Sequence, residues 1–132
     1  MTAEETGGEE ARGDGGARSP RELVLRFHRA WTGGDLDGAV ALLDEGFRCR
    51  APGRDIVGRS AYREYLAGFA QRLTGIEDIA CLAEGERVAL FSRPRTEHTA
   101  TAVAGECFTV RDGRILESVL VFDRLSYAPQ AG

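Results

Sequence analysis

The chain has 132 residues, 42% of them apolar and 29% charged, which is the size and balance of one globular domain. All 17 positive charges are arginines, so chemistry that requires a lysine Schiff base or a phosphate-loop lysine is excluded. The net charge of −4 disfavours nucleic-acid binding, and no apolar run exceeds five residues, so no membrane-spanning segment is expected.

The N-terminal segment changes character at residue 19. Residues 1–18 hold five glycines and five acidic residues, and a segment this poor in apolar side chains is expected to be a disordered tail. Ser19-Pro20-Arg21-Glu22 then forms the pattern of a capping box with proline at the first helical position. Apolar residues recur at helical spacing as far as Trp31, and Gly33-Gly34 is predicted to end this helix.

Two further helices are predicted before the chain changes to strand character. Asp35 is a capping residue for a short helix whose apolar face extends to Leu43. Gly58 opens a third helix with an apolar face through Leu73, and Thr74-Gly75 closes it.

Strand patterns fill the remainder. Alternation of apolar and polar residues predicts one strand at Phe47–Ala51, and Asp112-Gly113 is a hairpin signal between the last two strands. We therefore expect an α+β fold in which helices pack on one face of a curved sheet, over residues 19–126, followed by a flexible C-terminus at 127–132. The four later strands, all antiparallel, are expected at Ile76–Leu82, Arg87–Arg93, Thr99–Val110 and Arg114–Asp123.

Several motifs together carry a family resemblance. Residues 26–38 (RFHRAWTGGDLDG), Gly58 with YREY at 62–65, FTVRDGRI at 108–115 and the closing Phe122-Asp123 resemble the NTF2-like superfamily, in its SnoaL-like and ketosteroid-isomerase-like branch. The resemblance covers about residues 20–124. It implies an NTF2-like cone, in which a curved antiparallel sheet wraps around about three N-terminal helices and leaves a pocket for a small apolar or polycyclic molecule. Members pair through the outer sheet face, where Thr101, Val103, Cys107 and Thr109 fall, so a homodimer is expected.

Strand parity and the resemblance together select the residues of the expected pocket. If Ala51 faces inward, so do Phe47 and Cys49, whereas Arg48 and Arg50 face outward. Parity with Glu106 also places alanines on the inner face, which either accommodate the packed helix or leave room for a ligand. These alanines are Ala100, Ala102 and Ala104. The pocket residues that we expect are Phe27, Trp31, Phe47, Ala51, Tyr62, Tyr65, Phe108 and Leu120.

Glu106 is the candidate catalytic residue. By resemblance to the ketosteroid isomerases, Ala51 occupies the position of the base carboxylate, and Phe27 occupies that of the tyrosine in the oxyanion hole. Only Glu106 retains the expected residue type, because it falls at the position of the protonated acid. Isomerase activity by that mechanism is therefore not expected. A carboxyl group within an apolar strand either pairs with an arginine or tyrosine hydroxyl, or stays neutral and donates to a ligand.

Other chemistries of the family are poorly matched. The cyclase members carry a carboxylate where Leu120 falls, the epoxide hydrolases use an asparagine that this chain lacks, and the dehydratases need two histidines. Only His28 and His98 are present, and the sequence leaves open which of them faces the pocket. Three separated cysteines have no zinc-site spacing, so neither a metal nor a cofactor is expected.

The sequence thus predicts a cytoplasmic SnoaL-like protein that binds a small apolar molecule in a cone-shaped pocket, because no signal segment is visible and the cysteines fit a reducing compartment. Two alternatives stay open. One is an isomerase, cyclase or dehydratase that uses Glu106 as the pocket acid. The other is a non-catalytic dimeric interaction domain whose cone is filled.

Overall fold

The computed structural model describes residues 19–127, so the predicted tail at 1–18 and the end of the chain at 128–132 lie outside the described residues. The first helix, α1 (Pro20–Thr32), begins with the predicted capping box. The Glu22 amide donates to Ser19 Oγ over 3.1 Å, and the Ser19 amide donates to Glu22 Oε1 over 3.0 Å. These two bonds satisfy backbone donors that a helix start leaves free.

The second helix is shorter than the sequence pattern predicted. α2 spans Leu36–Val40, and Leu43 begins a strand instead of ending the helix, because its backbone pairs with Ile115. The register of this pairing shifts between Leu43 and Arg48. Two short elements, β3 (Arg54–Val57) and α4 (Arg124–Tyr127), were not predicted, and α4 extends one residue past the expected domain end at 126. The remaining elements are β2 (Leu43–Ala51), β3 (Arg54–Val57), α3 (Arg59–Arg72), β4 (Leu73–Glu84), β5 (Arg87–Thr96), β6 (Ala104–Arg111), β7 (Arg114–Val121) and α4 (Arg124–Tyr127).

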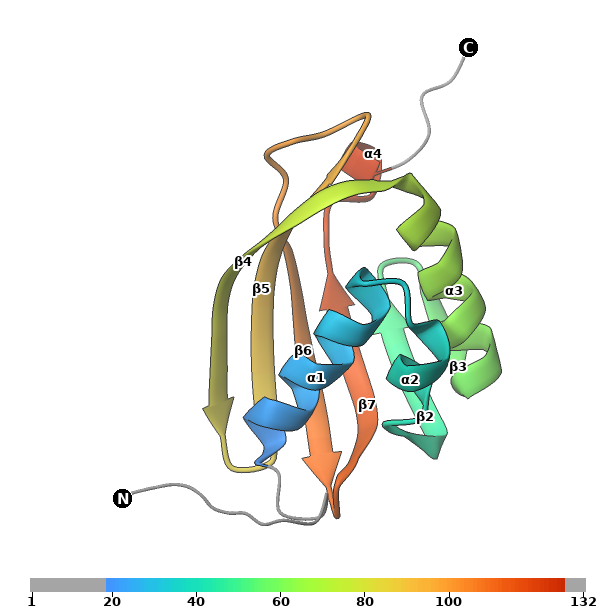
Figure 1. Cartoon of the computed structure of the whole chain (residues 1–132), viewed down its shortest axis with the longest axis vertical. Helices are drawn as coiled ribbons and strands as arrows, with labels where there is room; N and C mark the ends of the chain where they lie inside the picture. The colour runs from blue at the N-terminus through green and yellow to red at the C-terminus, as the bar shows by residue number, and fades with distance from the viewer. Residues whose placement is uncertain (1–18, 128–132) are drawn as a thin grey trace.

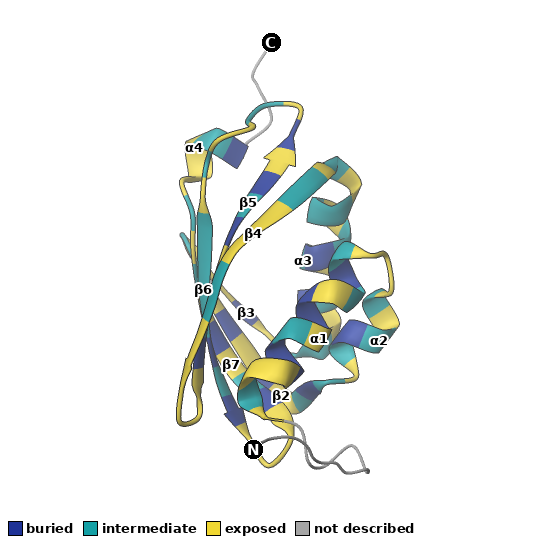
Figure 2. Cartoon of the chain, turned by 60° about the vertical axis from the view of Figure 1, so that its left-hand side comes forward, coloured by how far each residue is buried: buried dark blue, intermediate teal, exposed yellow. Residues whose placement is uncertain are grey.

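One six-stranded sheet organises the domain in the order β3-β2-β7-β6-β5-β4. The last four strands are antiparallel, as predicted, whereas β2 joins β7 in parallel and makes the sheet mixed. α1, α2 and α3 lie together on the concave face of the curved sheet, and the start of β4 crosses from the end of α3 back to the sheet (Figures 1 and 2). This arrangement is the expected α+β cone.

The strand predicted at Thr99–Val110 begins later than expected. β6 starts at Ala104, and the preceding segment is a turn in which Thr96 and Thr99 form only an isolated bridge. Threonine hydroxyls take over the backbone pairing, since Thr96 Oγ1 accepts from His98 N at 3.1 Å and Thr99 Oγ1 accepts from Ala102 N at 3.2 Å. Ala100, Thr101, Ala102 and Val103 therefore lie before β6 and not on it, so strand alternation does not assign them to a face of the sheet.

The core between helices and sheet centres on the Tyr62 ring, which is 1% exposed. The ring centroid of Phe47 lies 4.7 Å from that of Tyr62, and Phe27 packs on both Tyr62 and Phe108, at 6.2 and 5.8 Å. Buried stretches occur in both layers, in the helices and in the strands of the sheet (Figure 2). The aromatic side chains thus fill one end of the cone.

Candidate functional site

The other end of the cone is open and forms a cavity of about 660 Å³. This volume lies within the range of sites that hold drug-sized molecules. Of the predicted pocket residues, Trp31, Ala51, Tyr62, Tyr65 and Leu120 line it, together with Glu106. Three predicted pocket residues, Phe27, Phe47 and Phe108, belong to the core and are not among the residues that line the cavity. Lining residues that the sequence did not indicate include His28, Arg54, Gly68, Phe69, Arg72, Ser92, Phe122, Arg124 and Tyr127.

Glu106 projects into this cavity from β6, between Leu90 of β5 and Leu120 of β7. Both of its hydrogen-bond donors converge on one carboxyl oxygen, since Tyr62 Oη donates to Oε2 over 3.0 Å and Ser118 Oγ over 2.7 Å. Within residues 19–127, no arginine or histidine nitrogen lies within 4.0 Å of the carboxyl group. The tyrosine partner is therefore present and the arginine partner is not.

Desolvation decides the protonation of Glu106. Burial among apolar side chains raises its pKa from 4.5 to about 7, and the hydrogen bonds from Ser118 and Tyr62 lower the pKa without cancelling that effect. At neutral pH the group therefore exists in both its acid and its anionic form. An acid with this pKa can give up and recover a proton at physiological pH.

The hydroxyl and thiol groups around Glu106 stay protonated. Burial raises the pKa of Tyr62 well above its ordinary value and the pKa of Tyr65 to about 12, and the nearby Glu106 charge raises both further. Burial likewise raises the pKa of Cys49 to about 12. The tyrosines are thus hydrogen-bond donors in the site, and Cys49 is an inert thiol, because the nucleophilic form of cysteine is the thiolate.

A histidine of the helix layer lines the same cavity and is paired with an aspartate of the sheet. His28 of α1 is 4% exposed and lines the cavity, and its Nε2 lies 2.8 Å from Asp78 Oδ1 on β4. Its ring meets the Trp31 ring edge-on at 6.0 Å. His98 lies in the turn after β5, 3.6 Å from Glu97, and is not among the lining residues. The sequence did contain a signal that His28 lines the pocket. It precedes Trp31 by three residues on one helix, and this spacing places both side chains on the same face.

One face of α3 forms a wall of the cavity with a gap in it. Tyr65, Gly68, Phe69 and Arg72 recur at three- and four-residue spacing and all line the cavity. A Cβ built on Gly68 meets no atom within 4 Å, whereas its neighbours on this face are large. The missing side chain therefore leaves open space in the wall.

No helix among residues 19–127 is long and apolar enough to cross a bilayer. The same part of the chain contains no cluster of three or more side chains arranged to hold a metal ion.

Comparison with known proteins supports the class that this cone defines, an NTF2-like fold. A crystal structure from Kribbella flavida DSM 17836 is 33% identical and has a TM-score of 0.76, over 80% of this chain and 88% of that one. An NTF2-like protein from Cytophaga hutchinsonii, at 21% identity and TM-score 0.69, covers 81% and 92%. A protein of ketosteroid isomerase-like fold from Catenulispora acidiphila, solved with trimethylamine, is 15% identical with a TM-score of 0.66, over 80% and 88%.

The family follows from the sequence match. Residues 24–118 match the model of the SnoaL-like domain, which is most of the described chain, and the chain belongs to this family. No curated protein matches the sequence.

Proposed function

We propose that this protein binds a small, largely apolar molecule in its cone and that Glu106, in its neutral form, donates a hydrogen bond to an oxygen of that molecule. The observation that carries the proposal is a carboxyl group with a pKa of about 7 facing a cavity of about 660 Å³. Because Tyr62 and Ser118 both donate to Oε2, Oε1 is left to carry the proton toward the cavity.

The three cysteines form no disulfide with one another, which fits a cytoplasmic location.

The gap at Gly68 gives a direct test with the neutral fluorescent probe N-phenyl-1-naphthylamine. Wild-type protein is expected to bind one probe per chain, whereas Gly68→Phe should weaken binding at least tenfold, because the ring would occupy the open space. The matched control, Gly68→Ala, adds only a methyl group. It should keep probe binding and raise stability by roughly 0.5–1 kcal/mol, because alanine is the better helix former. Fluorescence titration and thermal unfolding measure both.

The contrary result is equally clear. Failure of the wild-type protein to take up the probe, and to retain any small molecule in native mass spectrometry after purification from its source organism, would favour a filled cone. The non-catalytic interaction domain would then be the better reading.

A second candidate function is catalysis by proton transfer. The observation that favours it is that His28, held by Asp78, lines the same cavity as Glu106 but from the helix layer. An acid on the sheet side and a base on the helix side are the groups that an isomerisation or a dehydration requires. A ketone bound between them would receive a hydrogen bond at oxygen and lose a proton from the adjacent carbon.

We also propose that the protein is a homodimer that pairs through the convex face of the sheet. Leu82 of β4 and Val119 of β7 lie in one row across the outer face, linked by Ala89 of β5 and Cys107 of β6. Leu82, Val119 and Val121 are 61%, 46% and 63% exposed. Phe91 adds a partly exposed ring to the same face. Such a continuous apolar surface is uncommon on a monomer, and a two-fold axis would bury the same patch on both copies.

Assembly can be tested by analytical ultracentrifugation at micromolar concentration. The wild-type chain should sediment at about twice its mass, and Val119→Arg should sediment as a monomer, because a two-fold interface brings the two new charges together. The control Leu125→Arg changes a residue of α4 that is 81% exposed, and it should remain dimeric. A monomeric wild-type protein would contradict the proposal.

A further inference from the structure

We propose that the mouth of the cavity binds the anionic group of the ligand, a carboxylate or an equivalent oxyanion, through Arg72 together with Arg54 and Arg124. The inference rests on the proposed function, since it names the chemical class of the molecule that enters the cone. That molecule would have an apolar body, an oxygen for Glu106 at one end and a negative charge at the other.

Arg72 is the central residue of this site. It lies in the last turn of α3 and lines the cavity, its guanidinium lies over the Phe69 ring at 5.7 Å, and its Nη2 donates to the carbonyl oxygen of Tyr127. Its Nε is buried and has no hydrogen-bond partner within residues 19–127. A buried donor without a partner is unfavourable, so the acceptors of the described chain do not saturate this guanidinium group.

Arg54 approaches the same point from β3. Its guanidinium lies 5.5 Å from the centroid of the Tyr65 ring, on the cavity wall. The charges of both Arg54 and Arg72 act to lower the pKa of the Tyr65 hydroxyl, against the stronger effect of burial that raises it. Two cations from separate elements are therefore close to one phenol, whose hydroxyl is itself a donor.

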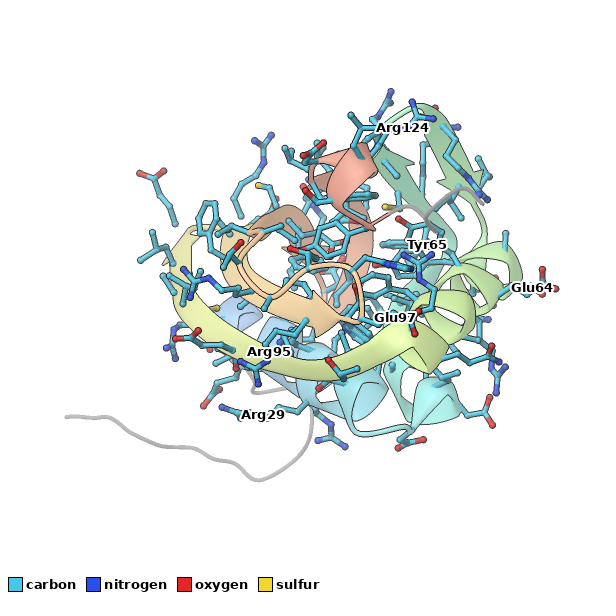
Figure 3. The ribbon with its side chains drawn as sticks, turned by 90° about the horizontal axis from the view of Figure 1, so that it is seen from above. Arg29, Glu64, Tyr65, Arg95, Glu97 and Arg124 are labelled. Atoms are coloured by element: carbon cyan, nitrogen blue, oxygen red, sulfur yellow. The ribbon has the colours of Figure 1, made fainter. Side chains whose placement is uncertain are left out.

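Arg124 completes the set from α4. It reaches across to the β2–β3 turn, where a Cβ built on Gly53 would lie 2.7 Å from its Nη1. Gly53 has a φ of +81°, so glycine allows both this turn and the close approach of the guanidinium. In the view from above, Arg124 lies at the α4 edge of the molecule and Tyr65 points inward from α3 (Figure 3).

No carboxylate of the described chain neutralises these three cations. None of them lies within 4.0 Å of an acidic oxygen between residues 19 and 127. The acidic residues that line the cavity are Glu106 and Glu64. Glu106 is partly neutral, and the side chain of Glu64 points away from the cavity (Figure 3). An excess of positive charge is thus left at the mouth of a cavity whose walls are apolar.

The arrangement fits a carboxylate better than a phosphate ester or a nucleotide. Guanidinium groups bind carboxylates and phosphates alike in paired hydrogen bonds, so the walls of the cavity decide between the two. The walls between the mouth and Glu106 are formed by side chains such as Trp31, Phe69 and Phe122, which favour a ring system over a hydrated sugar or polyphosphate. We therefore infer a cyclic or aromatic carboxylic acid that carries a carbonyl or hydroxyl oxygen at its far end.

Two probes with nearly the same skeleton separate the anion site from the cone. 8-Anilinonaphthalene-1-sulfonate carries one negative group, and N-phenyl-1-naphthylamine lacks it. Arg72→Gln should raise the dissociation constant of the sulfonate about tenfold and change that of the neutral probe less than twofold. The control Arg29→Gln changes an arginine of α1 that points away from the cavity (Figure 3), and neither constant should change. Gly68→Phe should weaken both probes, which assigns both to the cone.

The outcomes distinguish this inference from the proposed function. If the neutral probe binds in the cone and Arg72→Gln leaves the sulfonate unaffected, or weakens both probes equally, the anion site is overturned and the cone function stands. If neither probe binds the wild-type protein, the proposed function fails as well. Should Arg72→Gln not fold, salt provides the test on wild-type protein. Raising NaCl from 0.05 to 0.5 M should weaken the sulfonate several-fold and spare the neutral probe, and equal responses would overturn the site.

Discussion

The free energy of unfolding of the wild-type protein is expected to fall by about 3 kcal/mol as the pH rises from 4.5 to above 7, and Glu106→Gln is expected to abolish this fall. The cause is that the folded protein holds the proton of Glu106 more tightly than the unfolded chain does. Below pH 4.5 the carboxyl group is neutral in both states and has no effect. Between pH 4.5 and about 7 the unfolded chain releases the proton and the folded protein retains it, so the free energy of unfolding falls. Above about pH 7 both states are ionised and the loss is complete.

Urea unfolding at pH 4.5, 6, 7 and 8 would measure this difference between the wild-type protein and Glu106→Gln. The variant keeps the size of the side chain, and its amide oxygen can still accept from Tyr62 and Ser118. It should therefore match the wild type at pH 4.5 and exceed its stability at pH 8. The control Glu117→Gln alters an exposed carboxylate of β7 and should follow the wild-type profile. Parallel profiles for Glu106→Gln and wild type would show that Glu106 ionises as freely in the fold as in the unfolded chain.

The features that the sequence predicted well are those that depend on near neighbours along the chain. The capping box at Ser19 and the alternation through Phe47, Cys49 and Ala51 are set within a few residues, and both were confirmed. The position of Glu106 on the inner face of β6 follows from the same alternation. Local patterns of this kind decide which side chains face inward before any long-range contact forms.

The features that the sequence could not predict depend on contacts between distant segments. Residues 99–103 alternate like a strand, but threonine hydroxyls close a turn there instead. His28 meets Asp78 fifty residues further along the chain. The cationic mouth is assembled from Arg54, Arg72 and Arg124, on three elements of which two were not predicted at all. An arginine-rich sequence gives no reason to single these out, since only the fold brings them to one opening.

The pairing of acid and base across the cavity leads to the largest functional effect that we expect. The carboxylate of Asp78 lies at Nε2 of His28, and this contact favours the tautomer with its proton on Nε2 and a free lone pair on Nδ1. On the proposed catalytic function, Nδ1 of His28 would be the base and the Oε1 proton of Glu106 the acid. In D2O such a site should exchange the α-protons of 2-tetralone, an apolar bicyclic ketone, because Glu106 polarises the carbonyl while His28 removes the adjacent proton.

Exchange followed by proton NMR should be faster with wild-type protein than in buffer alone, and His28→Gln should lower the protein-dependent rate by about 100-fold, the lower end of what general acid–base groups contribute. Gln can still donate to Asp78, so the fold should survive the change, and thermal unfolding would verify this. His98→Gln is the matched control, because His98 is not among the cavity-lining residues, and it should exchange at the wild-type rate. An unchanged rate in His28→Gln would make His28 a structural partner of Asp78. A wild-type rate no faster than that of buffer would instead leave ligand binding without chemistry as the function.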